Sequence, residues 1–413
     1  MANTPNIRFQ GFTDDWEQRK LGDYLQVSSE KNRDNRFTKD DVLSVSGEYG
    51  IVNQIEFQGR SFAGASVSNY GVVETGDVVY TKSPLKSNPY GIIKTNKGIP
   101  GIVSTLYAVY RPKEITDSKF VQIYFELDSR MNSYMHPLVN KGAKNDMKVS
   151  AENALKGMVS FPQKDEQKRI SSYFDTLDHL ITLHQRKCDE MKKMKKFMLQ
   201  KMFPKNGAKN PEIRFDGFTD DWEQRKLGEV CERITRKNIN NESDLPLTIA
   251  SQYGLIDQRD FFNKIVAAKD MSNYYLLKKG EFAYNKSYSK GFDYGSIKRL
   301  NAYEQGCLST LYICFGITSD DMDSDYLECF FDTLKWYSDI TMICAEGARN
   351  HGLLNVDTKA FFDEVTISMP SSKEEQCMIS AYLKNLDHLI TLHQRKAENL
   401  KNLKKYMLQN MFV

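Results

Sequence analysis

An internal repeat constrains this chain of 413 residues more than any other feature. The eleven residues FTDDWEQRKLG stand at 12–22 and again at 218–228, and LDHLITLHQRK stands at 177–187 and again at 386–396. Two identities of this length cannot arise by chance, so the chain consists of two copies of one unit. A period of roughly 200 residues excludes the short-repeat solenoids.

Between these constant ends the two copies diverge, and only short motifs remain recognisable. The matching motifs are YG at 49–50 and 253–254, YTKS at 80–83 with YNKS at 284–287, YGIIK at 90–94 with YGSIK at 294–298, STLY at 104–107 and 309–312, and KGAKN at 141–145 with EGARN at 346–350. Constant ends around variable middles predict a fixed frame that carries two different recognition surfaces. Duplication followed by drift is the alternative, but drift alone would not leave the ends identical.

The end of each copy is predicted to form a long helix with a coiled-coil seam, because apolar residues recur at alternating spacings of three and four. The first seam is Ile170, Phe174, Leu177, Ile181, His184, Cys188, Met191, Met198 and Met202. The second seam is Ile379, Leu383, Leu386, Ile390, His393, Ala397, Leu400, Met407 and Met411. Lys195 and Lys404 interrupt the two seams at matching positions.

Neither helix can keep such a stripe exposed to water, so we expect the two helices to pack on each other. Antiparallel packing would relate the two copies by a pseudo-two-fold axis and place the two histidines of the seams near the crossing. There they are predicted to be packed polar residues that set the register, with a metal site or a pH switch as the alternative. A helix of about 55 Å matches roughly one and a half turns of B-DNA.

The expected fold class is α+β, with two β-rich globular domains held apart by two long antiparallel coiled-coil helices. Short strand-like runs broken by Gly, Pro, Asn and Ser favour the β-rich assignment over a helix-turn-helix. The predicted order is a first globular domain at 1–163, a helix at 164–203, a linker at 204–211, a second globular domain at 212–370 and a helix at 371–413. The linker assignment follows from two prolines and a glycine in PKNGAKNP.

Motifs for catalysis are absent from the sequence. It contains no phosphate-binding loop, no dinucleotide-binding glycine pattern and no HExxH zinc motif. Asn88-Pro89-Tyr90 resembles part of the Asn-Pro-Pro-Tyr motif of adenine methyltransferases, but the second proline is missing and a turn is the simpler interpretation. We therefore predict no catalytic residues, no metal ligands and no cofactor.

Composition excludes some classes of protein. Lys+Arg 57 against Asp+Glu 54 gives a net charge of +3, which excludes a histone-like polycation, and 40% hydrophobic residues exclude a largely disordered chain. No apolar run approaches the roughly 20 residues of a membrane-spanning helix, and no secretion signal is recognisable. The seven cysteines form no CxxC pair, which favours reduced thiols. We expect a cytoplasmic protein with no membrane partner.

Positive charge is concentrated locally despite the balanced total. Residues 78–113 contain six basic and no acidic side chains, and residues 264–299 contain eight basic and three acidic ones, with tyrosines interleaved in both. Such segments favour contact with DNA phosphates, and the alternatives are a solvated edge for the lysines and the sheet core for the tyrosines. The candidate DNA contacts are Lys82, Ser83, Lys86, Asn88, Lys94, Lys97, Lys144, Asn145, Lys286, Ser287, Lys290, Lys298, Arg299, Arg349 and Asn350.

The whole arrangement resembles the specificity subunit of type I restriction-modification systems. The residues that support the resemblance are WEQRKLG at 16–22 and 222–228, together with a proline, Glu-Gln, Ile, Leu-Asp and Ile pattern at the start of each helix. That pattern is Pro162, Glu166, Gln167, Ile170, Leu177, Asp178 and Ile181 in the first copy, and Pro370, Glu375, Gln376, Ile379, Leu386, Asp387 and Ile390 in the second.

The resemblance implies a non-catalytic subunit that reads double-stranded DNA. Each target-recognition domain would read one half of a bipartite, asymmetric site, and the helices would set the unread spacer. Two methyltransferase subunits, which use S-adenosylmethionine to modify adenine, would dock on the chain, and two motor-nuclease subunits would join for cleavage. The resemblance supplies no base-contacting residues, so the candidate contacts depend on charge and loop position alone.

Two other functions remain open from the sequence. A stand-alone DNA-binding regulator with a bipartite site is the first, although such regulators usually dimerise one copy and read a palindrome. A pure assembly protein whose coiled coil is its whole purpose is the second, but it would have no use for acid-free basic segments.

Overall fold

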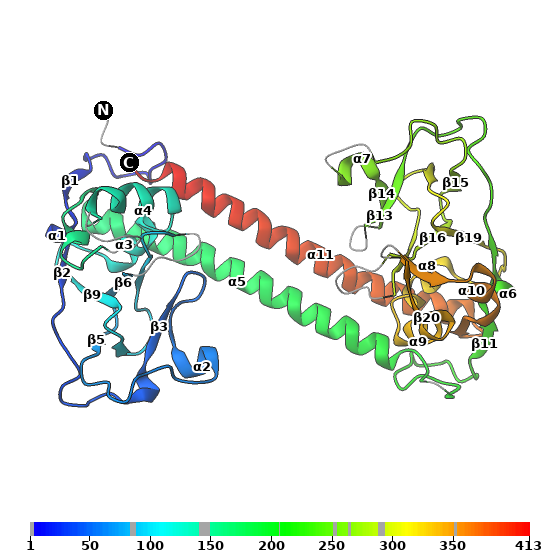
Figure 1. The fold of residues 1–413 in the computed structure, drawn as a ribbon, viewed down its shortest axis with the longest axis horizontal. Coiled ribbons are helices and arrows are strands. Elements are labelled where there is room, and N and C mark those ends of the chain that lie inside the picture. The colour runs from blue at the N-terminus through cyan, green and yellow to red at the C-terminus, as the bar shows by residue number, and fades with distance from the viewer. Residues whose placement is uncertain are drawn as a thin grey trace. The chain divides into compact units, whose positions relative to one another are not determined.

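A computed structural model describes residues 4–82, 88–139, 149–205, 207–250, 254–262, 266–287, 294–350 and 353–413. The chain divides into two compact units. Unit 1 comprises residues 1–185 and 394–413, and unit 2 comprises residues 186–393. Each unit therefore contains one globular domain, the start of its own long helix and the end of the other copy's long helix (Figure 1). The predicted domain boundaries follow the chain, whereas the compact units cut across both long helices.

Unit 1 is built on a four-stranded antiparallel sheet in the order β2-β9-β6-β7, with smaller pairs β1-β10, β3-β4 and β5-β8. Its strands are β1 (Glu17–Lys20), β2 (Leu25–Val27), β3 (Leu43–Ser46), β4 (Gly50–Asn53), β5 (Gly71–Val73), β6 (Val78–Thr81), β7 (Ile93–Thr95), β8 (Gly101–Val103), β9 (Tyr107–Pro112) and β10 (Met158–Phe161). Its helices are α1 (Leu21–Tyr24), α2 (Gln54–Gln58), α3 (Ser118–Tyr124), α4 (Asp128–Met135) and the start of α5 (Lys164–Lys201), with 3₁₀ turns at Lys39–Asp41, His136–Leu138 and Asn153–Leu155.

Unit 2 repeats this topology, with a sheet in the order β12-β19-β16-β17 and pairs β11-β22, β13-β14, β15-β18 and β20-β21. Its strands are β11 (Glu223–Lys226), β12 (Cys231–Arg233), β13 (Leu247–Ala250), β14 (Gly254–Asp257), β15 (Tyr275–Lys278), β16 (Phe282–Asn285), β17 (Ser296–Arg299), β18 (Gln305–Leu308), β19 (Ile313–Ile317), β20 (Cys344–Asn350), β21 (Leu353–Val356) and β22 (Thr366–Met369). Its helices are α6 (Leu227–Val230), α7 (Gln258–Phe261), α8 (Ser324–Phe330), α9 (Leu334–Ile343), α10 (Thr358–Glu364) and the start of α11 (Lys373–Asn410). The α+β prediction is confirmed.

The Glu-Gln pair at the start of each long helix joins that helix to its own globular domain. Glu166 is 2% exposed and accepts two hydrogen bonds from Arg8, at 2.7 Å each. Gln167 accepts a hydrogen bond from the backbone N–H of Asp117 (2.8 Å), and Asp117 in turn caps α3. The second copy reproduces these bonds with Glu375 on Arg214 and Gln376 on Asp323. The repeated motif is thus an internal anchor, because a buried carboxylate is stable only when it is paired.

The long helices pack antiparallel within each unit, as predicted. In unit 1 the α5 residue Phe174 contacts Phe412, two residues beyond the end of α11, and the α5 residue Asp178 contacts Lys404 of α11, so the partner number falls as the α5 number rises. Among the predicted seam residues, Ile170, Leu177, Ile181, Ile379 and Leu386 are buried, and His184, Met191, Ile390, His393 and Leu400 are half-buried. The separation of the two recognition domains stays a prediction.

A phenylalanine two residues beyond the end of each long helix packs into the core of the domain formed by the other copy. Phe412 lies against Phe120 and Trp16 in unit 1, with ring centroids 5.6 and 6.2 Å away. Phe203 occupies the matching place in unit 2, 5.5 Å from Tyr326 and 6.1 Å from Trp222. Each core is therefore made by residues from both copies of the repeat.

Candidate DNA interface

Lys82 and Lys286 lie at matching ends of the sheets, directly after β6 and β16. The Lys82 ammonium donates to the carbonyl oxygen of Thr105 at 2.7 Å and has no ion pair with any carboxylate in the described part of the chain. Burial lowers the pKa of Lys82 and the nearby charge of Lys31 lowers it further, while the carboxylate of Glu152 opposes both effects. A DNA phosphate would stabilise this charged ammonium, because it would supply the ion-pair partner that no described carboxylate provides. Lys286 is half-buried, and Ser287 donates its N–H to Asn285.

Lys94 and Lys298 were expected at the DNA-facing surface, but the side chains of both lie largely in the interior. Lys94 on β7 is 8% exposed, and Lys298 on β17 lies 3.9 Å from the carboxylate of Asp332 with 17% of its side chain exposed. Burial lowers the pKa of Lys94, while Glu126 opposes this effect. Glu126 and Asp332 occupy equivalent positions, so this lysine of the YGIIK and YGSIK motifs belongs to a repeated internal charge cluster, which argues against DNA contact at this position.

Three further candidates already have protein partners. The Lys97 ammonium is 2.6 Å from Asp175, and Asn88, which is 7% exposed, donates to Asp128 at 2.9 Å. Arg299 is 10% exposed and pairs with Asp325 and Glu328. Arg299 and Asn88 are largely buried because carboxylates from other elements of the fold pair with them, which argues against DNA contact at these two positions. Lys97 is half-exposed, but its charge is neutralised in the same way.

The remaining candidates cannot be located as side chains. Ser83, Lys86, Lys144, Asn145 and Lys290 lie outside the described residues. The backbone of Arg349 and Asn350 lies on β20, in register with Leu354 and Leu353 of β21. All seven stay predictions.

Sequence reasoning missed a cluster of exposed aromatic residues in unit 1, which we call the hairpin patch: Tyr49, Phe57, Arg60 and Phe62. Tyr49, at the β3-β4 turn, is 60% exposed and lies 5.3 Å from the ring of Phe57 on α2. The Arg60 guanidinium lies 4.5 Å over the ring of Phe62, which is 56% exposed. Exposed aromatic rings with an adjacent cation are typical of binding surfaces. The repeated Tyr-Gly motif was the only sequence signal, since α2 itself resembles an ordinary short helix.

The β3-β4 hairpin and the strand end that carries Lys82 are connected through the segment that leads into β9. Val45 and Ile51 of the hairpin pack with Tyr107 on one small apolar cluster. The backbone N–H of Lys82 donates to the carbonyl oxygen of Leu106, the residue before Tyr107. In unit 2, α7 carries the exposed Phe261 at the position that matches Phe57. Figure 1 places α2 and α7 at the periphery of their respective units.

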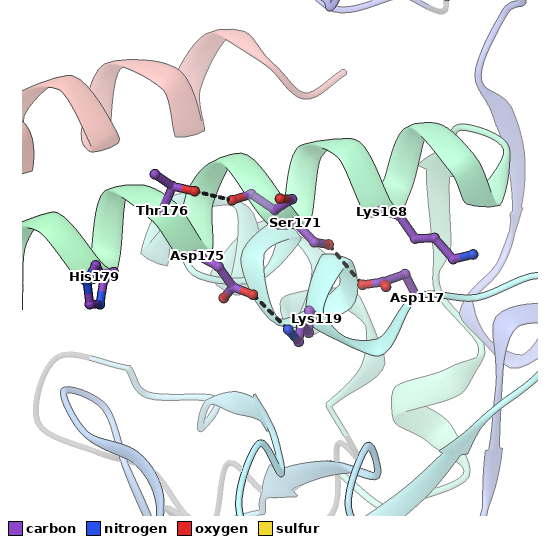
Figure 2. A pocket seen from close by; sticks show the side chains of 8 residues that line it. Asp117, Lys119, Lys168, Ser171, Asp175, Thr176 and His179 are labelled. Atoms are coloured by element: carbon purple, nitrogen blue, oxygen red, sulfur yellow. Dashed lines mark hydrogen bonds and ion pairs between the residues drawn. The ribbon is translucent and has the colours of Figure 1, made fainter.

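A hollow of about 490 Å³ lies between α3 and α5 in unit 1 (Figure 2). Its lining residues are Asp117, Lys119, Lys168, Ser171, Ser172, Asp175, Thr176 and His179. Two of its carboxylates are already in use: Asp117 accepts from Ser171 at 2.8 Å, and Asp175 pairs with Lys119 at 2.8 Å. The hollow therefore presents satisfied polar groups, which is typical of a structural crevice.

Among the described residues, no group of three or more His, Cys, Asp or Glu side chains is placed to hold a metal ion. None of the described helices is both long enough and apolar enough to cross a bilayer.

Each unit contains a four-stranded antiparallel sheet and parts of both long helices, and comparison with family models identifies the duplicated domain. Residues 13–193 and 219–402 each match the family described as the type I restriction modification DNA specificity domain. The chain belongs to this family, with two copies of the domain.

One solved structure shows the same fold over almost the whole chain. The S subunit of a type I restriction-modification system from M. genitalium aligns with a TM-score of 0.61 at 12% identity, covering 99% of both chains. The HsdS subunit from Thermoanaerobacter tengcongensis aligns with a TM-score of 0.45 at 16% identity, covering 100% of this chain and 99% of that one.

Proposed function

We propose that this chain is a non-catalytic specificity subunit in which each globular domain reads one half of a bipartite, asymmetric DNA site. The observation that supports it most directly is the duplicated frame around two divergent surfaces. Equivalent frame residues make equivalent contacts in both units, while the hairpin patch of unit 1 is not reproduced residue for residue in unit 2. Two different readers in one chain suit a site whose halves differ.

DNA contact in unit 1 is proposed for Lys82 and the hairpin patch, with Lys82 on a phosphate and the patch on the groove. In unit 2 the matching elements are Lys286 and α7 with its exposed Phe261. Lysine contacts contribute sequence-independent affinity, and the aromatic residues contact base edges and sugars. The inward-facing lysines and Arg299 maintain the fold.

Partner docking is proposed for surfaces that face solvent and are either identical in both copies or apolar at the equivalent positions. Within LDHLITLHQRK the same five positions are exposed in each copy, which are His179, Thr182, Gln185, Arg186 and Lys187 and their equivalents. Further along, Met194 and Phe197 are 43% and 47% exposed, and their equivalents Leu403 and Tyr406 are 38% and 54% exposed. Packing does not require identical residues at exposed positions, so their identity suggests that both copies bind the same partner. Two copies of one methyltransferase subunit fit this requirement. Two motor-nuclease subunits would then join that complex.

The test is to express the chain with an adenine methyltransferase subunit of a type I restriction-modification system from the same genome and to map methylated adenines across the host genome. We expect one bipartite motif with two different half-sites, and its loss when the chain is deleted. Persistence of every motif after deletion would contradict the proposal. DNA binding by the chain alone, with no effect on methylation, would support the stand-alone regulator.

Matched variants separate reading from docking in the same experiment. Lys82→Glu with Tyr49→Ala should weaken methylation through the first half-site, whereas Phe197→Glu with Tyr406→Glu should abolish methylation by preventing recruitment while DNA binding persists. Lys94→Gln serves as the interior control, because it should change stability and leave the recognised sequence unaltered.

A further inference from the structure

One ion pair between a globular domain and its own long helix has opposite polarity in the two units. In unit 1, Lys119 on α3 lies 2.8 Å from Asp175 on α5. In unit 2, Asp325 on α8 lies 2.5 Å from Lys384 on α11. The positions are equivalent, because Lys119 and Asp325 each stand two residues after the aspartate that caps their helix, and Asp175 and Lys384 each stand two residues before the identical segment.

In each unit a second cation also pairs with the acidic residue of this ion pair. Lys97, after β7, lies 2.6 Å from Asp175, whereas Arg299 on β17 pairs with Asp325. The acid is thus on the long helix in unit 1 and on the globular domain in unit 2, with two cations around it in both.

Contacts between the two copies show no such inversion. Lys404 pairs with Asp178 and Glu126, both at 2.6 Å, and Lys195 pairs with Asp387 and Asp332, both at 2.8 Å. Here the equivalent positions carry the same charge. This within-copy ion pair is therefore specific to its own copy, whereas the Lys404 and Lys195 contacts between copies, like the Arg8–Glu166 and Arg214–Glu375 anchors within them, have stayed interchangeable.

We propose that the inverted ion pair makes the start of each long helix, up to residues 176 and 385, specific to its own globular domain. An exchange that ends where the helix begins would place Lys97 and Lys119 against Lys384, and would place Asp325 and Glu328 against Asp175. An exchange that ends at 176 and 385 carries both partners of each pair together. Its boundary then falls at the first residue of the identical segment.

The experiment compares two full-length exchanges by calorimetry. The short exchange swaps residues 23–161 with 229–369, and the long exchange swaps residues 23–176 with 229–385. Because like charges replace the ion pairs of Asp175 and Lys384, the short exchange should melt about 4–8 °C below the long one. Adding Asp175→Lys and Lys384→Asp to the short exchange should recover most of that loss.

A packing control separates charge from shape, since Phe174 and the equivalent Leu383 are both fully buried. Phe174→Leu with Leu383→Phe should not restore the short exchange, and restoration by this pair in place of the charge pair would overturn the proposal. Equal melting of the two exchanges would overturn it as well.

Variants of the natural chain test the same pair if an exchange fails to fold. Asp175→Lys should lower the melting temperature of unit 1, and Lys119→Asp added to it should restore stability, because the double variant reproduces the arrangement of unit 2. Additive losses would contradict the proposal. These readouts concern assembly and do not require that the chain reads DNA; exchanged half-site order in the methylome of the long exchange would rest on the proposed function.

Discussion

At the residue scale, the two lysines that interrupt the coiled-coil seams are internal cations. Burial alone lowers the pKa of Lys404, but the carboxylates of Glu126 and Asp178 outweigh burial and raise it above the usual value. We expect Lys404→Met to destabilise unit 1 by about 1–3 kcal/mol, since two carboxylates lose their counter-ion but remain partly solvated. Hydrogen exchange should locate the loss in unit 1, and Lys405→Met, an exposed neighbour, should have little effect.

The ion pairs of Lys404 with Glu126 and Asp178 also predict how the stability of unit 1 changes at alkaline pH. A lysine with a raised folded-state pKa stabilises the fold fully below the ordinary pKa of 10.5, and that stabilisation is lost as the pH rises through the folded-state value. The natural chain should therefore lose stability above about pH 10.5 more steeply than Lys404→Met does. Parallel pH curves for the two proteins would contradict this assignment.

At the element scale, each long helix is followed, two residues beyond its end, by a phenylalanine that packs into the core of the other copy's domain. Phe412 is 6% exposed and also receives the Arg130 guanidinium 4.7 Å from its ring. Phe412→Ala should destabilise unit 1, at the far end of the chain, by about 2–4 kcal/mol through the cavity it leaves. Phe203→Ala should do the same to unit 2, and Val413→Ala, which removes an exposed side chain, is the matched control. Limited proteolysis distinguishes the two units, and a loss confined to unit 2 in Phe412→Ala would refute the exchange of helix ends.

At the scale of the whole molecule, the helices are predicted to set the spacing between the two half-sites. Deleting one heptad from each seam, residues 182–188 and 391–397, should shorten the preferred spacer by about three base pairs, because seven residues span about 10.5 Å. Methylome mapping measures the spacer directly. An unchanged spacer would show that something other than helix length sets it.

Local patterns in the sequence were sufficient for the fold class, the long helices and their antiparallel seam. Heptad spacing of residues such as Ile170 and Leu177 depends only on helix geometry and the burial of apolar side chains, so it can be interpreted without a structure. The anchoring motif around Glu166 was recognisable as a pattern, but its role as the partner of Arg8 required coordinates.

Which basic side chains are free to contact DNA could not be predicted from the sequence, for a physical reason. Whether a lysine is free depends on carboxylates that come from distant parts of the chain, as Asp175 does for Lys97 and Asp332 does for Lys298. The exposed pairing of Tyr49 and Phe57 likewise depends on how a hairpin and a short helix meet. A local count of charges contains neither kind of information.

The sequence by itself therefore determined that one unit is used twice, with constant ends and variable middles, and that long helices close each copy. Only the tertiary structure decided that each compact unit draws on both copies, which basic residues face inward, and that the Lys119–Asp175 pair is inverted at Asp325–Lys384. Periodicity is a property of neighbouring residues, whereas charge pairing and core completion join residues that the chain separates by tens to hundreds of positions.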